Sequence, residues 1–288
     1  MSVFSELDKF GLGQIKEQKL YSETDKGNEE NKKPVFIKVK PLEEQDFLYQ
    51  KKFECPLCGE TLTSLTVMTG KVHVKKYEVD LRPVYDTVDE LKYDVIACPG
   101  CGYAALKNYF SSPTKHQIDA IRNGICMNYK PQKNELDYYS YEVALERYQL
   151  ALANAMVKNA KNSEKAYICL KMSWLIRGMI EELETFDKIE DKEKIEKYRD
   201  DEKELISGAL EGFLNALQTE DFPIAGMNPM TLDYILAALY METGDYDNSL
   251  KVIGNVLGSR SANSRTKDKI RDLKDLVNEK KSAAKGLL

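Results

Sequence analysis

Two stretches, Cys55-Pro56-Leu57-Cys58-Gly59 and Cys98-Pro99-Gly100-Cys101-Gly102, decide how the first half of this chain folds. Two CxxC pairs on separate tight turns can bring four thiolates to one tetrahedral ion, as in a closed structural zinc site. The proline after each first cysteine starts the turn, and the glycine after each second cysteine tolerates positive φ. We therefore predict a structural Zn²⁺ whose ligands are Cys55, Cys58, Cys98 and Cys101.

Iron is the alternative metal, because rubredoxin-type sites use the same turns and a four-sulfur site admits either ion. With four thiolates the coordination is complete, so the metal is not expected to activate water. His73 and His116 are the only histidines, and we expect both to be ordinary surface residues. Cys126 and Cys169 have no CxxC partner, and we expect them to pack inertly among apolar neighbours.

The residues around the cysteines predict a small antiparallel sheet. Residues 47–53 run extended into the first CPxCG turn, and residues 93–97 form a strand that delivers Cys98. β-Branched residues at 62–67 and 71–77 flank Thr69-Gly70, which predicts a hairpin between these two segments. A thin sheet that carries two such turns is typical of a zinc-ribbon or rubredoxin-like module, and we assign it residues 44–111. Residues 1–43 are predicted to be an N-terminal amphipathic segment followed by a flexible linker.

From Ser112 onward the apolar residues recur at helical spacing, which predicts an all-α domain over residues 112–288. Ser112-Pro113 is a suitable N-cap and first-turn pair, and Asn228-Pro229 is a second such start. The fold class is therefore α+β. The helices are expected near residues 112–129, 137–158, 163–186 and 189–218, then on either side of Gly244, and at 262–281.

The helices on either side of Gly244 resemble one tetratricopeptide repeat. Ala237, Tyr240, Gly244 and Tyr246 fall where that repeat has its small residue, tyrosine, glycine and second aromatic residue. Ser249 stands in place of the usual alanine and Ile253 in place of an aromatic residue, so the match is partial. The pattern favours a tetratricopeptide-like stack of helical hairpins.

Other prominent residues have structural interpretations. Arg82 lies between the two turns and either serves recognition or pairs with Asp86 or Asp89; we favour the pairing. Trp174 is expected in the core rather than at a ligand platform.

Composition limits the partners. The 288 residues carry a net charge of −5, which argues against a nucleic-acid partner. No apolar run is long enough to span a bilayer and no signal peptide is recognisable, so we expect a cytoplasmic protein without membrane contact. A reducing compartment also favours metal-bound thiolates over disulfides.

An array of residues resembles the bacterial family called domain of unknown function 2225. The resemblance covers about residues 44–260 and implies a zinc-ribbon-like start, a tetratricopeptide-like helical end and no established activity. It is carried by Phe47, Cys55-Pro56-Leu57-Cys58, Thr69-Gly70-Lys71, Leu81-Arg82-Pro83-Val84-Tyr85 and Tyr93-Asp94-Val95-Ile96-Ala97-Cys98-Pro99-Gly100-Cys101-Gly102-Tyr103-Ala104-Ala105.

The sequence favours a non-enzymatic adaptor that binds an unidentified protein or peptide partner on its helical scaffold. No phosphate-binding loop, dinucleotide fingerprint or metalloprotease helix is present. Two alternatives stay open. One is a nucleic-acid-binding ribbon that uses Lys71, His73, Lys75 and Lys76, and the other is an enzyme or a rubredoxin-like electron carrier.

Overall fold

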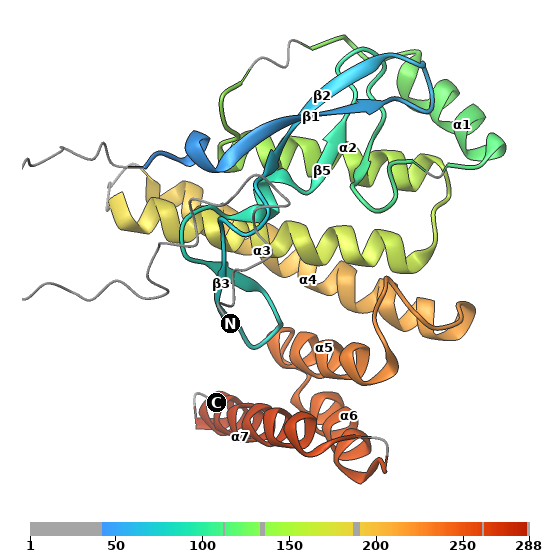
Figure 1. The fold of residues 1–288 in the computed structure, drawn as a ribbon. Coiled ribbons are helices and arrows are strands. Elements are labelled where there is room, and N and C mark those ends of the chain that lie inside the picture. Colours follow the sequence, from blue (N-terminus) through green and yellow to red (C-terminus); the bar gives the residue numbers. More distant parts are fainter. Residues whose placement is uncertain (1–41, 112, 133–135, 187–190, 261, 287–288) are drawn as a thin grey trace, which may run out of the picture. The chain divides into compact units, whose positions relative to one another are not determined.

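The computed structural model describes residues 42–111, 113–132, 136–186, 191–260 and 262–286. These residues belong to one compact unit, Leu42–Leu288. The predicted amphipathic segment and nearly all of the linker lie outside the described residues. The described part is α+β, with three antiparallel strand pairs followed by a helical region (Figure 1).

Two of the strand pairs are hairpins whose turns are the CPxCG sequences. Strand β1 (Leu48–Glu54) pairs with β2 (Thr61–Val67), and β5 (Val95–Ala97) pairs with β6 (Ala104–Leu106). The innermost pairs, Glu54 with Thr61 and Ala97 with Ala104, enclose six residues each. The third pair joins β3 (Val74–Tyr77) to β4 (Pro83–Tyr85).

The predicted hairpin between residues 62–67 and 71–77 is wrong. A turn does form at Gly70, which has φ of 77°, but the chain then leaves the sheet. Val72 turns inward and packs in a core cluster with Leu48 and Leu65. The backbone partner of β2 is instead β1, because the first CPxCG turn reverses the chain directly.

Seven α-helices follow in the described residues. Their bounds are α1 (Lys115–Ile121), α2 (Tyr141–Val157), α3 (Asn162–Phe186), α4 (Lys192–Thr219), α5 (Pro229–Glu242), α6 (Tyr246–Gly258) and α7 (Ser264–Gly286). The first helix is shorter than predicted: Thr114 caps it through a hydrogen bond from the Gln117 N–H, and a π-helical turn, Arg122–Cys126, continues it. Ser112 lies outside the described residues. Asn228 caps α5 as predicted, accepting from the Thr231 N–H.

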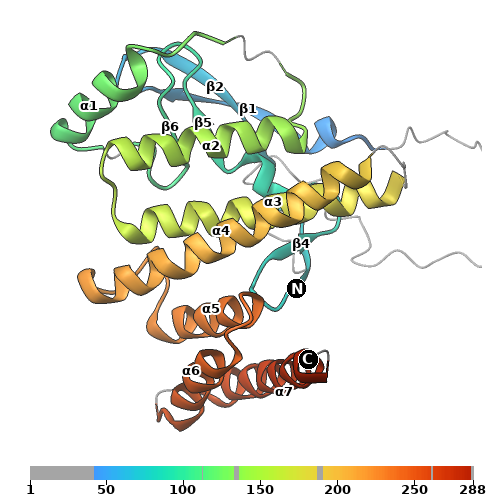
Figure 2. The same ribbon diagram turned by 180° about the vertical axis from the view of Figure 1, so that it is seen from behind.

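The helices pack in the order in which they occur. From α2 to α7 each helix contacts the next, and β5 and β6 lie against α2 (Figures 1 and 2). The α5–α6 turn is the predicted one: Gly244 has φ of 81°, and Asp245 caps α6 through the Asn248 N–H. At the crossing of these two helices the Ser249 hydroxyl is fully buried and donates to the Ala237 carbonyl at 2.7 Å.

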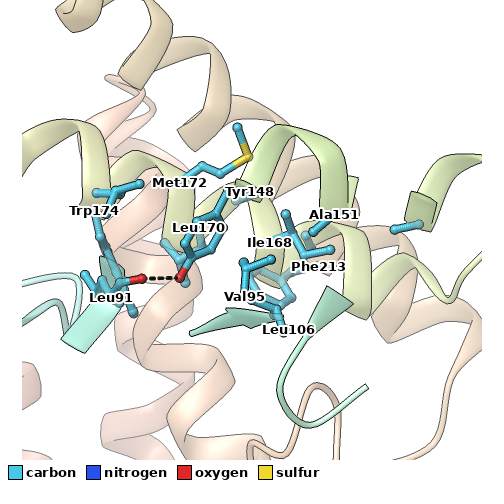
Figure 3. Close-up of a cluster of buried hydrophobic side chains, with 14 of the residues drawn as sticks. Leu91, Val95, Leu106, Tyr148, Ala151, Ile168, Leu170, Met172, Trp174 and Phe213 are labelled. Carbon is cyan, nitrogen blue, oxygen red and sulfur yellow. Dashed lines mark hydrogen bonds between the residues drawn. The ribbon is translucent and has the colours of Figure 1, made fainter. Parts of the chain in front are cut away.

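One hydrophobic core joins the strands to the helices. The buried Tyr148 hydroxyl of α2 donates to the Leu91 carbonyl at 3.1 Å, just before β5 (Figure 3). Trp174 is buried as predicted. The division at residue 111 stays a prediction, but the core itself is continuous from β5 and β6 to α4. Figure 3 labels members of this core from the strand region (Leu91, Val95, Leu106), α2 (Tyr148, Ala151), α3 (Ile168, Leu170, Met172, Trp174) and α4 (Phe213).

Candidate metal centre

The two cysteine turns have the same backbone structure. In the first, the Gly59 N–H donates to the Cys55 carbonyl at 2.9 Å, and in the second the Gly102 N–H donates to the Cys98 carbonyl at 3.0 Å. Both glycines have positive φ, 76° and 77°. Every position of the first turn thus has its counterpart 43 residues later in the chain. The sequence motif was recognised, but its repetition as a complete hairpin was not.

The four sulfurs converge on one point. Cys55 Sγ lies 3.6 Å from Cys101 Sγ, and Cys58 Sγ lies 3.7 Å from Cys98 Sγ. All four sulfurs lie within 4.8 Å of one another. A tetrahedral ion with metal–sulfur bonds of about 2.3 Å places its sulfurs about 3.8 Å apart. The cluster therefore could hold a metal ion with only slight adjustment.

The electrostatics of the cluster favour a thiolate at Cys98. Contact with Cys101 Sγ, then with Cys55 Sγ, lowers the pKa of Cys98, whereas the contact between Cys55 and Cys101 raises the pKa of Cys101, and the pKa of Cys55 is raised as well. Backbone N–H groups of Gly100 and Cys101 also point to Cys98 Sγ and stabilise its charge. Each sulfur of a bound ion must lose its proton, and such N–H groups spread the resulting negative charge.

Side chains from the helical region hold both turns in place. Arg122 Nη2 donates to the Leu57 carbonyl in the first turn at 2.9 Å. The fully buried Asn154 Nδ2 of α2 donates to the Gly102 carbonyl in the second turn at 3.0 Å. Sequence reasoning missed both residues, because an arginine and an asparagine inside helical patterns carry no motif.

The second turn is also closely covered by the segment after the π-helical turn. A Cβ atom on Gly102 would lie 2.5 Å from the Tyr129 ring, so the ring packs directly against the glycine. The Gln132 N–H donates to the Pro99 carbonyl at 3.0 Å. These contacts exclude solvent from one side of the turn, while Cys58 of the first turn stays exposed.

The remaining histidines and cysteines do not complete the site. His73 is exposed on the loop before β3 and lies 3.6 Å from Asp86, and His116 is exposed in the first turn of α1. Cys126 is half-buried beside the cluster, where its thiol meets Cys101. The prediction that Cys126 has only apolar neighbours is therefore wrong. Cys169 of α3 is partly buried against the hydrophobic core, and burial raises its pKa to about 11.

Arg82 has a structural role, but not with the predicted partners. Its guanidinium is buried and binds both carboxylate oxygens of Glu181 in α3, at 2.8 and 2.6 Å. The loop that carries it continues this network, since Asp80 accepts from the Trp174 indole at 2.9 Å and pairs with Arg177 at 3.0 Å. Asp86 and Asp89, the partners expected from the sequence, form no ion pair with Arg82 among the described residues.

The basic residues of the alternative nucleic-acid-binding ribbon, Lys71, His73, Lys75 and Lys76, are all exposed. Lys75 and Lys76 are consecutive in β3, where the pairing with β4 shifts register between Val74 and Lys76. Lys71 lies in the preceding turn, and His73 is beside an aspartate.

Comparison with known proteins adds a family and no activity. A family model described as an uncharacterised protein conserved in bacteria, domain of unknown function 2225, matches residues 48–277. The match confirms the resemblance seen in the sequence. No curated protein and no solved structure matches the chain. None of the described helices combines the length and the apolar character that a membrane crossing requires.

Proposed function

This chain belongs to the bacterial family called domain of unknown function 2225, and we propose that it is a non-catalytic adaptor in which a structural zinc ion steadies a protein-binding helical scaffold. The observation that carries the proposal is a groove with an apolar floor and an acidic rim between α2 and α4, with α3 beneath it. The closed four-sulfur cluster supports a structural rather than a catalytic role for the metal.

The zinc assignment rests on the chemistry of the donor set. Four thiolates and no other ligand suit either Zn²⁺ or iron, and a zinc-ribbon-like site of this kind contributes folding free energy. The cluster joins two short hairpins that bury little apolar surface by themselves, so a metal cross-link would stabilise both. The six cysteines are free thiols, and a reducing cytoplasm would keep them available to the metal.

Metal analysis distinguishes the two ions. The full chain is purified without added metal, and its metal content and visible spectrum are measured. We expect about one zinc per chain and no visible absorption. A coloured, redox-active protein with one iron per chain would instead support the rubredoxin-like alternative and contradict the zinc assignment.

The groove has a lining that suits an amphipathic helix. Its volume is 580 Å³. Leu145 and Leu152 of α2, Met172 and Ile176 of α3, and Leu205 of α4 supply apolar surface. The charged residues that line it are all acidic: Asp201, Glu204 and Glu211 of α4. Among the described lining residues there is no lysine or arginine.

This lining selects one kind of occupant. An amphipathic helix inserts its apolar stripe into such a groove, and basic residues beside that stripe would meet the acidic rim. We therefore take the partner to be a protein segment that forms an amphipathic helix with lysine or arginine flanking its apolar face. The α5–α6 hairpin, with one tetratricopeptide-like unit, supports the scaffold interpretation because such hairpins stack into binding surfaces.

Charge reversal tests the groove. Glu204→Lys/Glu211→Lys should weaken capture of partners from the native host and remove the salt dependence of that capture, because both exposed acids face the groove. The matched control is Glu193→Lys/Glu196→Lys, which changes the net charge equally on exposed positions of α4 outside the groove. Equal partner recovery by wild type and both double variants would contradict the proposed surface.

A synthetic helix provides a direct measurement. A basic amphipathic peptide is titrated by calorimetry into the wild type and both double variants. We expect binding that falls with salt and is lost only in the groove variant. Binding that is independent of Glu204 and Glu211 would overturn the assignment of the partner to this groove.

A further inference from the structure

A second cavity lies between the second cysteine turn and α2, and it is separate from the groove described above. Its volume is 400 Å³, within the range of small-molecule pockets. Pro99 of the turn and Tyr129 form part of its wall, and the apolar side chains Val143 and Leu150 come from α2. Arg147 of α2 also lines it.

Arg147 is a buried cation with an incomplete set of partners. Only 8% of the residue is exposed. Nη2 donates to the Val95 carbonyl at 2.9 Å and the Ser64 hydroxyl at 3.2 Å, and the guanidinium lies 4.4 Å from the centre of the Tyr139 ring. Nε, in contrast, is buried without any hydrogen-bond partner. Among the described residues no carboxylate forms an ion pair with it.

Such a charge is costly unless something neutralises it. Burial lowers the pKa of Arg147, yet a guanidinium stays charged at any pH that a protein meets. The other deeply buried arginine, Arg82, has a carboxylate on both of its terminal nitrogens. A purely structural Arg147 would tie β2 to β5 through Ser64 and Val95. That role uses only Nη2. It leaves the positive charge without a carboxylate partner and Nε without an acceptor among the described residues.

We propose that this cavity binds a small monocarboxylate with an apolar body, whose carboxylate receives the Nε–H of Arg147. Val143, Leu150 and the ring of Pro99 provide surface for the apolar body. The Tyr129 hydroxyl has no hydrogen-bond partner among the described residues and is a second donor at the same wall. Among the described residues the structure gives hydrogen bonds to Nη2 alone, so Nε and Nη1 remain for a ligand, and this one edge of a single cation matches the two oxygens of a carboxylate better than the charge of a phosphate dianion.

The proposal extends beyond the adaptor function and does not depend on it. It does involve the metal site, since Pro99 belongs to the second cysteine turn and Gln132, another lining residue, bonds to its carbonyl. Chelation of the metal is therefore expected to weaken carboxylate binding. The groove variants Glu204→Lys/Glu211→Lys should leave it unchanged.

The test uses pairs of acids and neutral amides of the same shape. Benzoate and hexanoate are titrated into the zinc-loaded full chain beside benzamide and hexanamide, with Tm and the ¹⁵N–¹H cross-peak of Arg147 Nε as readouts. We expect the acids to raise Tm and to shift that cross-peak, and the amides to do neither. Equal effects of acid and amide, or an effect of inorganic phosphate alone, would overturn the proposal.

Variants of two neighbouring residues locate the site. Arg147→Lys keeps the charge but lacks the fixed Nε donor, so the benzoate affinity should fall about tenfold or more. Glu146→Gln removes an exposed acid from the lining of the cavity and should tighten binding. Unchanged affinity in a folded Arg147→Lys protein would contradict the role of Arg147.

One further variant tests whether the chain supplies its own counter-ion. Glu135 lies outside the described residues and is close to this wall in sequence. Glu135→Gln should leave Tm without ligand unchanged. If Glu135→Gln has a much lower Tm than wild type, and benzoate does not raise the Tm of the wild type, Arg147 has an internal ion pair and the proposal is overturned.

Discussion

Gly102 and Gly59 occupy equivalent positions in the two cysteine turns, yet their surroundings differ. Both have φ near the left-handed region, at 77° and 76°. A Cβ atom on Gly102 would lie 2.5 Å from the Tyr129 ring, whereas one on Gly59 would meet nothing within 4 Å. The pair therefore separates the cost of backbone strain from the cost of displacing a neighbour.

This difference gives a matched prediction. Gly59→Ala should lower the free energy of unfolding by about 1 kcal/mol, the cost of a left-handed alanine. Gly102→Ala should cost more, because the Tyr129 ring must also move. Chemical denaturation of both zinc-loaded variants measures the difference. Equal losses would show that Tyr129 does not pack firmly on the turn.

The ligand assignment can be tested at single sulfurs. Cys98→Ser should lose most of its bound metal, because Cys98 lies inside the cluster, 3.7 Å from Cys58 Sγ. Cys126→Ser is the control: its thiol is beside the cluster but outside the set of four. Metal content by mass spectrometry checks both. Full metal in Cys98→Ser, or loss in Cys126→Ser, would contradict the proposed ligand set.

The lowered pKa of Glu181 predicts that the stability of the protein depends on pH. Its hydrogen bonds from Arg82, opposed by burial, lower its pKa below the ordinary value of 4.5. The unfolded chain therefore binds this proton more readily. The contribution to stability is present above about pH 4.5 and is lost as the pH falls through the lower pKa of the folded state.

Unfolding measured from pH 6 to pH 3 should show this loss. Glu181→Gln should be less stable than wild type at pH 6, and the difference should shrink toward pH 3. Because metal release affects both proteins alike, the difference between them isolates the carboxylate. A difference that is constant with pH would exclude the Arg82–Glu181 pair as its source.

Residue types in a motif were predictable, and residues that act through tertiary contacts were not. The four cysteines and their glycines were identified from the spacing alone. Arg82 was recognised as structural, but its partner, Glu181, lies 99 residues away, and no local pattern relates the two. Asn154 is similar, since only the folded chain places its amide on the Gly102 carbonyl.

At the scale of elements, helix positions were easier to predict than strand pairings. Caps and apolar periodicity are local signals, so α3 and α5 begin within one residue of the expected starts. Strand pairing depends on which turn brings segments together. Thr69-Gly70 looked like a hairpin turn, but the CPxCG sequence formed the hairpin instead.

Alanine substitution at two glycines of the α5–α6 hairpin should change the stability in opposite directions. Gly244 has φ of 81°, and Gly254 lies inside α6 with open space around it. Gly244→Ala should destabilise the protein by about 1 kcal/mol, and Gly254→Ala should stabilise it by about 0.5–1 kcal/mol. Thermal unfolding of both variants provides the measurement. A stabilising Gly244→Ala would contradict the geometry of this turn.

At the scale of the whole molecule, the cysteine cluster and the helices belong to one packed structure. Asn154 ties α2 to the second cysteine turn, and β5 and β6 contribute to the same core as α2, α3 and α4. The sequence predicted two successive regions of different composition. It could not show that they share a core, because the positions of apolar residues along the chain do not say which elements pack against each other.

Metal removal should therefore affect more than the strands. With a chelator, hydrogen exchange is expected to speed up in both hairpins and in α2, while α6 and α7, which pack in a separate cluster, keep their protection. Asn154→Ala should reduce the effect on α2. Exchange that rises only in residues 48–106 would contradict this coupling.

The repeated hairpin has a consequence for the origin of such a site. Each copy, residues 48–67 and residues 95–106, presents two of the four sulfurs on a turn with the same backbone hydrogen bond. A short ancestral peptide with a single copy of the hairpin could have supplied four sulfurs to an ion only as a homodimer, with two identical chains related by a two-fold axis. Gene duplication followed by fusion would then turn that symmetric homodimer into the single chain seen here, and leave the second copy free to acquire contacts with the helices.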